Sequence, residues 1–219
     1  LRVVFQDPEF RFCMKVVAGI VALASFNLYL SGMPLWDAIN LGAFQSVSVV
    51  SGTGLVTANY PAHEIWPAFV PLLCLLGSFF GGCVGSTCGG IKAIRFLLLY
   101  KQSVREIRLL VRPTAQIAVK LGEHPIPDRV MQAVWGFYYL YIFCYCAFSL
   151  GLAATGIDLV TAFGSTAACL NNMGVGLGQT ANGFGVLNDT ATWMMSLAML
   201  VGRLEVFPLL LLFLPDFWK

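Results

Sequence analysis

The sequence predicts an all-α membrane protein with two parallel repeats. Each repeat is a spanning helix, a re-entrant half-helix, a glycine-rich ribbon and a second spanning helix. Hydrophobic residues make up 58% of the 219 positions and charged residues only 11%, which is far more apolar than a soluble domain. The same order of segments also occurs in both halves of the chain, which indicates an internal repeat.

The first half begins with an apolar run, Phe10 to Leu30, that is long enough to cross a bilayer. A break at residues 31–34 follows, and then the segment Trp36 to Val50, which is too short and too polar to cross comfortably. Such a segment is typical of a helix that enters the membrane part way and turns back. It leads directly into the first ribbon, Ser51 to Leu55.

The second spanning region of this half, Glu64 to Leu99, is much longer than the roughly 20 residues that one crossing needs. Glycine disfavours continuous helix, and hydroxyl groups can satisfy the carbonyls that a break frees. We therefore expect a broken helix with a central loop inside the membrane. The small residues that predict it are Gly77, Gly81, Gly82, Gly85, Ser86, Thr87, Gly89 and Gly90.

The second half repeats this order. A span at Val130 to Ala154 is followed by a half-helix at Gly156 to Leu170, and a second ribbon, Asn172 to Gly176, precedes an apolar segment from Trp193 onward. Close helix packing or a tight turn is the alternative explanation for the glycines of either ribbon alone.

Basic residues predict the orientation. Eight of the thirteen Lys and Arg lie between Lys92 and Arg129, whereas segments 31–66 and 151–192, which hold both ribbons, contain none. Both ends of the chain are therefore expected to be cytoplasmic, which makes the repeats parallel rather than inverted. The expected division is residues 1–100 for the first repeat, 101–129 for a basic cytoplasmic connector and 130–219 for the second repeat.

The ribbons predict an ion path. Irregular backbone at membrane depth must be buried in protein or must line water, and glycine lets successive carbonyls turn toward one axis. The glycines in question are Gly52, Gly54, Gly174, Gly176 and Gly178. Stacked carbonyl oxygens replace the water shell of a cation, as in potassium filters. The negative end of each half-helix would add attraction without a carboxylate.

Four stretches carry a resemblance to known proteins: SVVSGTGLVT from Ser48, GSFFGGCVGSTCGGIKAIR from Gly77, AACLNNMGVGLG from Ala167 and VGRLEVFPLLLLFLPDFWK from Val201. Together they resemble the C-terminal half of the TrkH/TrkG family of bacterial potassium-uptake proteins, within the Trk/Ktr/HKT superfamily. The resemblance covers nearly the whole chain. Members of the family have four such repeats around one pore, and this chain matches the third and fourth, so the first two are absent from it.

The resemblance implies potassium uptake across the bacterial inner membrane, with K⁺ as the transported ion and no cofactor in this chain. It also implies a homodimer of complete subunits and a cytosolic nucleotide-binding regulator resembling TrkA. The filter segments that it implies, whose backbone carbonyls would bind K⁺, are Ser51, Gly52, Thr53, Gly54 and Leu55 in one repeat and Asn172, Met173, Gly174, Val175 and Gly176 in the other.

The loop predicted between Gly77 and Gly90 is a plausible gate, because a break in a helix is cheap to rearrange. The resemblance implies the same, since the matching loop of the family is thought to obstruct the pore until regulation moves it. A rigid packing surface of small residues is the alternative. Lys92 could contact the loop or mark the cytoplasmic border, and Arg95 is expected at the border.

Arg203 lies too deep in the last apolar segment for its side chain to reach the interface. A deep charge normally faces a bundle interior, a partner or water. We expect Arg203 to face the pore below the ribbons or to pair with the loop. A structural bond to carbonyls is the alternative.

The remaining polar residues do not indicate an enzyme. Neither His63 and Glu64 nor Glu123 and His124 have a third partner for a metal or a catalytic triad. The seven cysteines lack paired spacing and are expected to be buried thiols. The basic connector is expected to touch anionic lipid or a cytosolic partner, and no nucleic acid is expected.

Two repeats would supply half of a four-sided filter, so function would require the missing N-terminal half or self-association. A truncated, non-conducting remnant and a secondary transporter with re-entrant loops are the alternatives. A transporter of that kind would be expected to carry ionisable residues at the midplane of both halves, whereas Arg203 and Glu205 occur in only one.

Overall fold

A computed structural model gives the structure of the chain and describes residues 7–57, 66–86, 88–113, 117–122, 124–205, 208 and 218. The described residues are mostly helical, with one pair of two-residue strands, and they confirm the predicted all-α class. Two helices, α2 and α6, are long and apolar enough to cross a membrane, and α4 and α7 are apolar but shorter. The elements are α2 (Pro8–Leu30), α3 (Leu35–Val50), α4 (Phe69–Ser78), α5 (Ala93–Val111), β1 (Lys120–Leu121), β2 (His124–Pro125), α6 (Asp128–Ala154), α7 (Leu159–Leu170), η1 (Gly178–Thr180), η2 (Phe184–Val186) and α8 (Asp189–Leu204).

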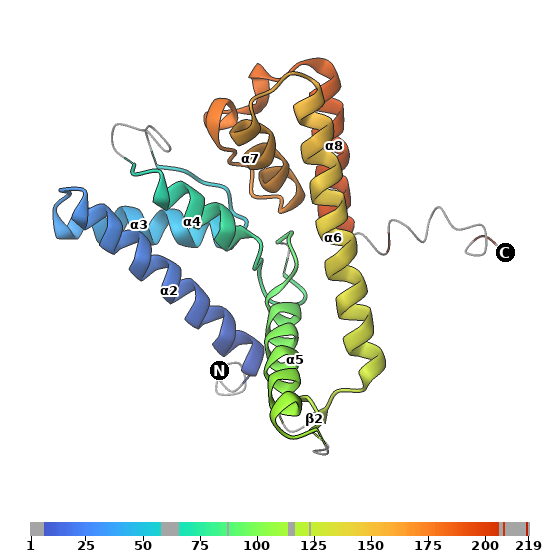
Figure 1. The fold of residues 1–219 in the computed structure, drawn as a ribbon. Helices are drawn as coiled ribbons and strands as arrows, with labels where there is room; N and C mark the ends of the chain where they lie inside the picture. The colour runs from blue at the N-terminus through green and yellow to red at the C-terminus, as the bar shows by residue number, and fades with distance from the viewer. Residues whose placement is uncertain are drawn as a thin grey trace.

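The first three helices pack as one group (Figure 1). Asp7 caps α2 by accepting a hydrogen bond from the backbone N–H of Glu9, and a turn at residues 31–34 reverses the chain into α3. The two helices approach closely at Gly42, where a Cβ atom would lie 2.9 Å from the backbone nitrogen of Ser25. Gly77 has a similar role, because a Cβ there would lie 2.8 Å from Cδ1 of Ile20. Gly77 therefore belongs to helix α4 and to its packing surface.

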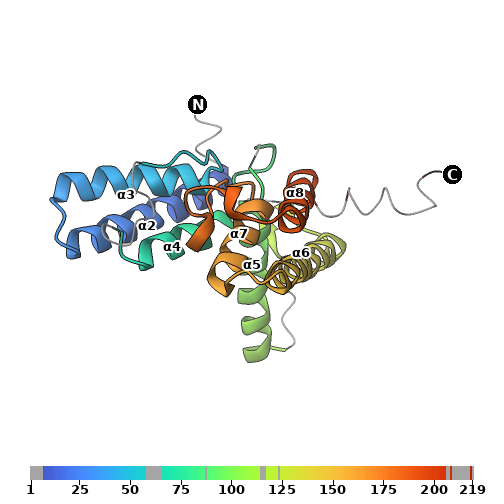
Figure 2. The same cartoon turned by 90° about the horizontal axis from the view of Figure 1, so that it is seen from above.

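Helices α6, α7 and α8 form the second group (Figure 2). Asp158 caps α7 and Asn188 caps α8, each through a side-chain oxygen that accepts a backbone N–H three residues on. Gly202 of α8 packs directly on the carbonyl of Leu170 at the end of α7. The core of this group is formed by Leu152, Ala162, Cys169, Ala191, Met195 and Ala198.

The two groups meet where α4 packs against α7. One continuous core joins Val70 and Cys74 of α4 to Ala167 and Ala168 of α7, together with Met173 just beyond α7. The C-terminal part of helix α7 is thus enclosed by protein, with its last residues Thr166–Leu170 all buried. Helix α5 packs beside the first part of α6, and Leu98 and Met131 belong to the same apolar cluster.

The long second span of the first half is broken, as its glycines predict. Helix α4 ends at Ser78, and helix resumes only at Ala93. We refer to residues 79–92 between them as the intramembrane loop; residue 87, the predicted gating residue Thr87, lies outside the described residues. Helix α5 continues through residue 100 to Val111, so the first part of the expected connector is helical.

The cysteines are all free, but the expectation that they are buried holds for only two of them. Cys74 and Cys169 are buried, Cys146 is exposed, and the other four are half-buried. Cys146 lies on α6, a helix with a large apolar exposed surface that includes Tyr139, Phe143 and Leu150. In a membrane-spanning helix a thiol can face apolar surroundings outside its own chain, so burial within the protein is not required.

Candidate functional site

The chain leaves α3 and α7 along the same backbone path. At the end of α3, the N–H of Thr53 donates to the carbonyl of Ser48 at 2.9 Å. At the end of α7, the N–H of Met173 donates to the carbonyl of Ala168 at 2.8 Å. The matching bonds pair Ser51 with Asn171 and Gly54 with Gly174 as equivalent positions. The second ribbon as predicted from sequence, residues 172–176, therefore begins one position later than its structural counterpart.

Backbone dihedrals agree with this pairing. Gly52 and Asn172 have φ angles of 65° and 53°, and Gly54 and Gly174 have φ angles of 73° and 82°. Asparagine is one of the few other residues that tolerate the left-handed region, so Asn172 can replace a glycine there. Gly176, by contrast, does not have positive φ; it is required by space, because a Cβ would overlap the hydroxyl of Thr180. The unusual backbone angle that glycine would permit at this position is therefore not observed.

The two ribbons touch. A Cβ placed on Gly54 would lie 2.5 Å from the carbonyl oxygen of Met173, which is closer than real Cβ atoms approach. Gly54 is therefore needed at this crossing for two reasons, its φ angle and the proximity of the other ribbon. Two segments about half the chain apart in sequence thus lie side by side at the ends of the two half-helices.

Two ribbon carbonyls accept hydrogen bonds from side chains. Ser51 accepts a hydrogen bond from the Cys88 thiol, with Sγ 2.7 Å from the oxygen, and Leu55 accepts one from the Ser48 hydroxyl at 2.6 Å. No backbone N–H of the described residues donates to the carbonyls of residues 52–54 or 172–176. Neither ribbon contains an acidic side chain. The carbonyl ends of α3 and α7 add partial negative charge at the same place.

The intramembrane loop lies against one end of both ribbons. Cys88 contacts the first ribbon through the bond to Ser51, and its Cα is 3.6 Å from a Cβ placed on Gly52. Its neighbour Gly89 packs on the carbonyl of Asn171, at the start of the second ribbon. The loop folds back on itself through two further bonds, from Ile91 N–H to the carbonyl of Phe79 and from Ala93 N–H to that of Gly82, at 3.0 and 3.2 Å.

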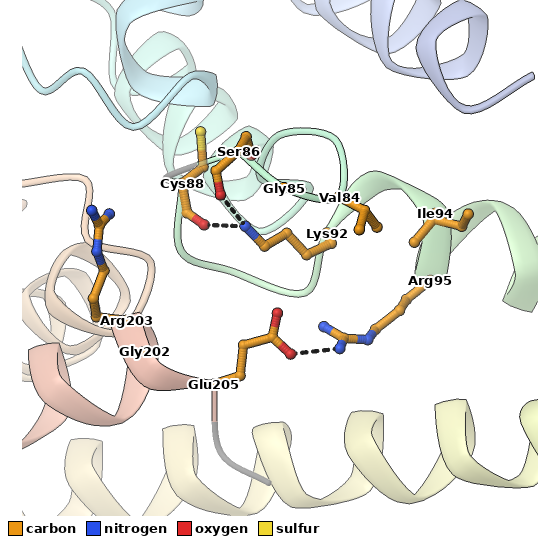
Figure 3. Close-up of a pocket in the computed structure, with 10 residues that line it drawn as sticks. All are labelled: Val84, Gly85, Ser86, Cys88, Lys92, Ile94, Arg95, Gly202, Arg203 and Glu205. Atoms are coloured by element: carbon orange, nitrogen blue, oxygen red, sulfur yellow. Dashed lines mark hydrogen bonds and ion pairs between the residues drawn. The ribbon is translucent and has the colours of Figure 1, made fainter. Parts of the chain in front are cut away.

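Lys92 contacts the loop. Its side chain is buried, and Nζ donates to the carbonyls of Ser86 and Cys88 at 2.9 and 2.5 Å (Figure 3). The residue has a φ angle of 77°, which is unfavourable for lysine. The sequence left two positions open for Lys92, against the loop or at the cytoplasmic border, and the structure shows contact with the loop. The loop also contains the predicted gating residues Gly81, Gly82, Gly85, Ser86, Gly89 and Gly90.

A cavity of about 490 Å³ lies between the loop and the end of α8. Arg203 is exposed and lines it on the side where Cys88 lies (Figure 3). Arg95 lines it from α5 and forms an ion pair with Glu205, with Nη2 and Oε2 2.7 Å apart. The Arg95 guanidinium also stacks on the ring of Phe137, 3.8 Å from its centroid. Glu205 therefore pairs across the cavity with a residue of α5.

One polar network beside the ribbons could not be predicted from the sequence. Asn171 is buried; its Nδ2 donates to the hydroxyl of Ser78 at 2.6 Å, and its Oδ1 accepts from the hydroxyl of Tyr141. The network joins the end of α4, the end of α7 and the middle of α6. Asparagine repeated at 171 and 172 was the only local hint, and it does not reveal either partner.

Comparisons with known proteins agree with these observations. Residues 9–219 match the TrkH family model, described as a cation transport protein. The chain is 43% identical over 220 residues to the Trk system potassium uptake protein TrkG of Escherichia coli (strain K12), covering 100% of this chain and 45% of that protein. It is 41% identical to the Trk system potassium uptake protein TrkH of Halomonas elongata, covering 98% of this chain and 44% of that protein.

A solved structure has the same fold. The crystal structure of the potassium transporter TrkH from Vibrio parahaemolyticus matches with a TM-score of 0.91 at 43% sequence identity, covering 99% of this chain and 46% of that chain. The chain thus spans about 45% of the length of the relatives that it matches. These relatives are transport proteins, in agreement with the expectation that the chain is not an enzyme. The family match over almost the whole length, with the helical fold and the paired ribbons, shows that this chain belongs to the TrkH family of cation transport proteins.

Proposed function

We propose that the chain forms two pore-lining repeats of a potassium uptake protein in the bacterial inner membrane, with both of its ends in the cytoplasm. K⁺ would lose its water onto the backbone carbonyls of residues 51–55 and 172–176, helped by the partial negative ends of α3 and α7. The observation that carries the proposal is the contact of two equivalent ribbons at Gly54 and Met173, with carbonyls to which no backbone N–H of the described residues donates.

The same geometry supports a gating role for the intramembrane loop. Residues 88 and 89 pack on the first residues of both ribbons, so an ion that leaves the ribbons toward this side meets the loop. Arg203 lines the cavity on that side, and a fixed positive charge there would oppose cations while the loop is in place. Movement of residues 83–86 and 88–90 away from the ribbons would open the path.

Two repeats enclose half of a four-sided filter. The proposed assembly therefore includes the part of the relatives' length that this chain does not match, within a homodimer of complete subunits. Membrane lipids and a cytosolic nucleotide-binding regulator resembling TrkA are the other proposed partners. Helix α5 and residues 117–128 carry the basic side chains that such partners would meet.

Complementation tests the proposal. The chain would be co-expressed with the N-terminal remainder of the Escherichia coli TrkG protein in bacteria that lack potassium uptake, and growth at low K⁺ and rubidium uptake would be measured. We expect the pair to restore both, while either half alone restores neither. Normal membrane levels of both halves without growth or uptake would refute the proposal and favour a non-conducting remnant.

A further inference from the structure

A buried carboxylate on the first helix binds the backbone of the intramembrane loop. Glu9 lies in the first turn of α2 and is only 7% exposed. Its Oε1 accepts a hydrogen bond from the N–H of Val84 at 2.7 Å, across 75 positions of sequence.

Burial of this carboxylate has a cost that the loop offsets. An anion removed from water is stable only where hydrogen bonds or positive charge replace its hydration. The N-terminal end of α2 supplies partial positive charge, and Val84 supplies the charge-assisted hydrogen bond. When the loop moves away, the carboxylate loses the bond to Val84. The favourable position of Glu9 therefore depends on the position of the loop.

Two more side chains on the same face of α2 meet the loop. The rings of Phe12 and Phe80 are 6.5 Å apart, and the thiols of Cys13 and Cys83 lie close enough to interact electrostatically. Glu9, Phe12 and Cys13 are spaced three and four residues apart, so they share one face of the helix. The first turns of α2 thus form a docking surface for loop residues 80–84.

The loop is held by opposite charges on its two sides. Glu9 binds a peptide N–H at Val84, and Lys92 binds peptide carbonyls at Ser86 and Cys88. Each charge is matched by polar groups of the loop backbone. Cys88 in turn contacts the first ribbon. A displacement of Val84 is therefore expected to displace Cys88 as well, because only a few residues separate the two.

We propose that Glu9 is a positioning residue for the intramembrane loop. Its carboxylate holds Val84 against α2 and so fixes residues 83–86 and Cys88 beneath the ribbons. The consequence for ion passage rests on the proposed function, in which this loop is the gate. The docking of the loop on α2 does not rest on it and can be measured without transport.

Hydrogen exchange followed by mass spectrometry tests the docking, with the chain in lipid nanodiscs. Glu9→Ala is expected to speed exchange across residues 80–93 at least about tenfold, the effect of losing a hydrogen bond to a charged group. The amides of Ile91 and Ala93 are the informative ones, because Glu9 does not touch them. Glu9→Gln keeps an acceptor oxygen and should restore much of the protection.

Glu106→Ala is the matched control, since Glu106 is an exposed carboxylate of α5 that bonds to Gln102. It should leave exchange in the loop unchanged. Faster exchange at Val84 alone, or unchanged exchange throughout the loop in Glu9→Ala, would overturn the proposal.

A cysteine cross-link provides a second test of the docking, which applies even if the Glu9→Ala protein folds poorly. Copper(II)–phenanthroline would oxidise Cys13 and Cys83 to a disulfide, with two protons released and two electrons passed to two copper(II) ions. The cross-link should form in the unsubstituted chain but not in Cys13→Ser. In Glu9→Ala it should restore slow exchange in the loop. Failure of the unsubstituted pair to cross-link, or fast exchange in the cross-linked variant, would contradict docking on α2.

Rubidium uptake by the complemented pair then tests the gate separately. Glu9→Ala is expected to raise uptake in the absence of a regulator, and Glu106→Ala is not. Faster loop exchange with unchanged uptake would refute gating by this loop while leaving the docking role of Glu9 intact.

Discussion

Replacement of Gly54 by alanine should destabilise the chain more than the same change at its counterpart, Gly174. Both positions have positive φ angles of similar size, 73° and 82°. Only Gly54 has a neighbour in the way: a Cβ there would lie 2.5 Å from the Met173 oxygen, whereas a Cβ on Gly174 meets nothing within 4 Å. Comparison of the two alanine variants therefore separates the cost of backbone strain from the cost of disturbing the contact between the ribbons.

The expected sizes follow from these two causes. Left-handed backbone costs alanine about 1–2 kcal/mol, which applies equally at both sites. At Gly54 the ribbons must also separate to restore normal contact, and forced overpacking of this kind costs about 1–3 kcal/mol. The difference between Gly54→Ala and Gly174→Ala should therefore be about 1–3 kcal/mol. For a chain of this length that corresponds to a gap of about 2–12 °C in midpoint temperature.

Thermal unfolding in detergent, followed by size-exclusion chromatography of heated samples, measures this gap. Gly32→Ala is a further control, because Gly32 has a φ angle of 93° and open space around it, but lies in the turn between α2 and α3. It should resemble Gly174→Ala. Equal midpoints for Gly54→Ala and Gly174→Ala would show that the ribbons do not touch, and the proposed filter would lose its main support.

Three further predictions concern side chains around the loop and ribbons. Tyr141→Phe removes the hydroxyl that bonds to Asn171 and should lower stability by about 1 kcal/mol, measured by the same thermal assay. Arg95→Ala and Glu205→Ala should show a coupling of no more than about 1 kcal/mol in a double-mutant cycle, since both side chains are partly exposed. Lys92→Gly should be more stable in that assay than Lys92→Met by about 1 kcal/mol, because both lose the loop bonds but only glycine accepts the φ angle of 77°.

Local features of the sequence were enough to predict most of the helices. Apolar length predicted the spans at Phe10–Leu30 and Val130–Ala154, which are observed as α2 (Pro8–Leu30) and α6 (Asp128–Ala154). Glycine content predicted the break after α4. These predictions succeed because length and glycine content act on the backbone directly.

Contacts between distant residues were not predictable in this way. The partners of Asn171, the bond from Glu9 to Val84 and the pairing of Arg95 with Glu205 each join segments far apart in sequence. A polar side chain in an apolar segment indicates that some partner is needed, but its identity depends on how the helices pack. The positive φ of Asn172 was missed for a related reason, since asparagine adopts that conformation only where its surroundings require it.

The intramembrane loop is held mainly through its peptide groups. The bonds at Val84, Ser86, Cys88, Ile91 and Ala93 all use backbone N–H or C=O atoms. The identity of a loop side chain such as Val84, which is 64% exposed, is therefore nearly irrelevant to the shape of the loop. Substitutions at that position can change the lining of the cavity while the loop keeps its shape. The chemistry of the cavity can therefore vary independently of the loop conformation.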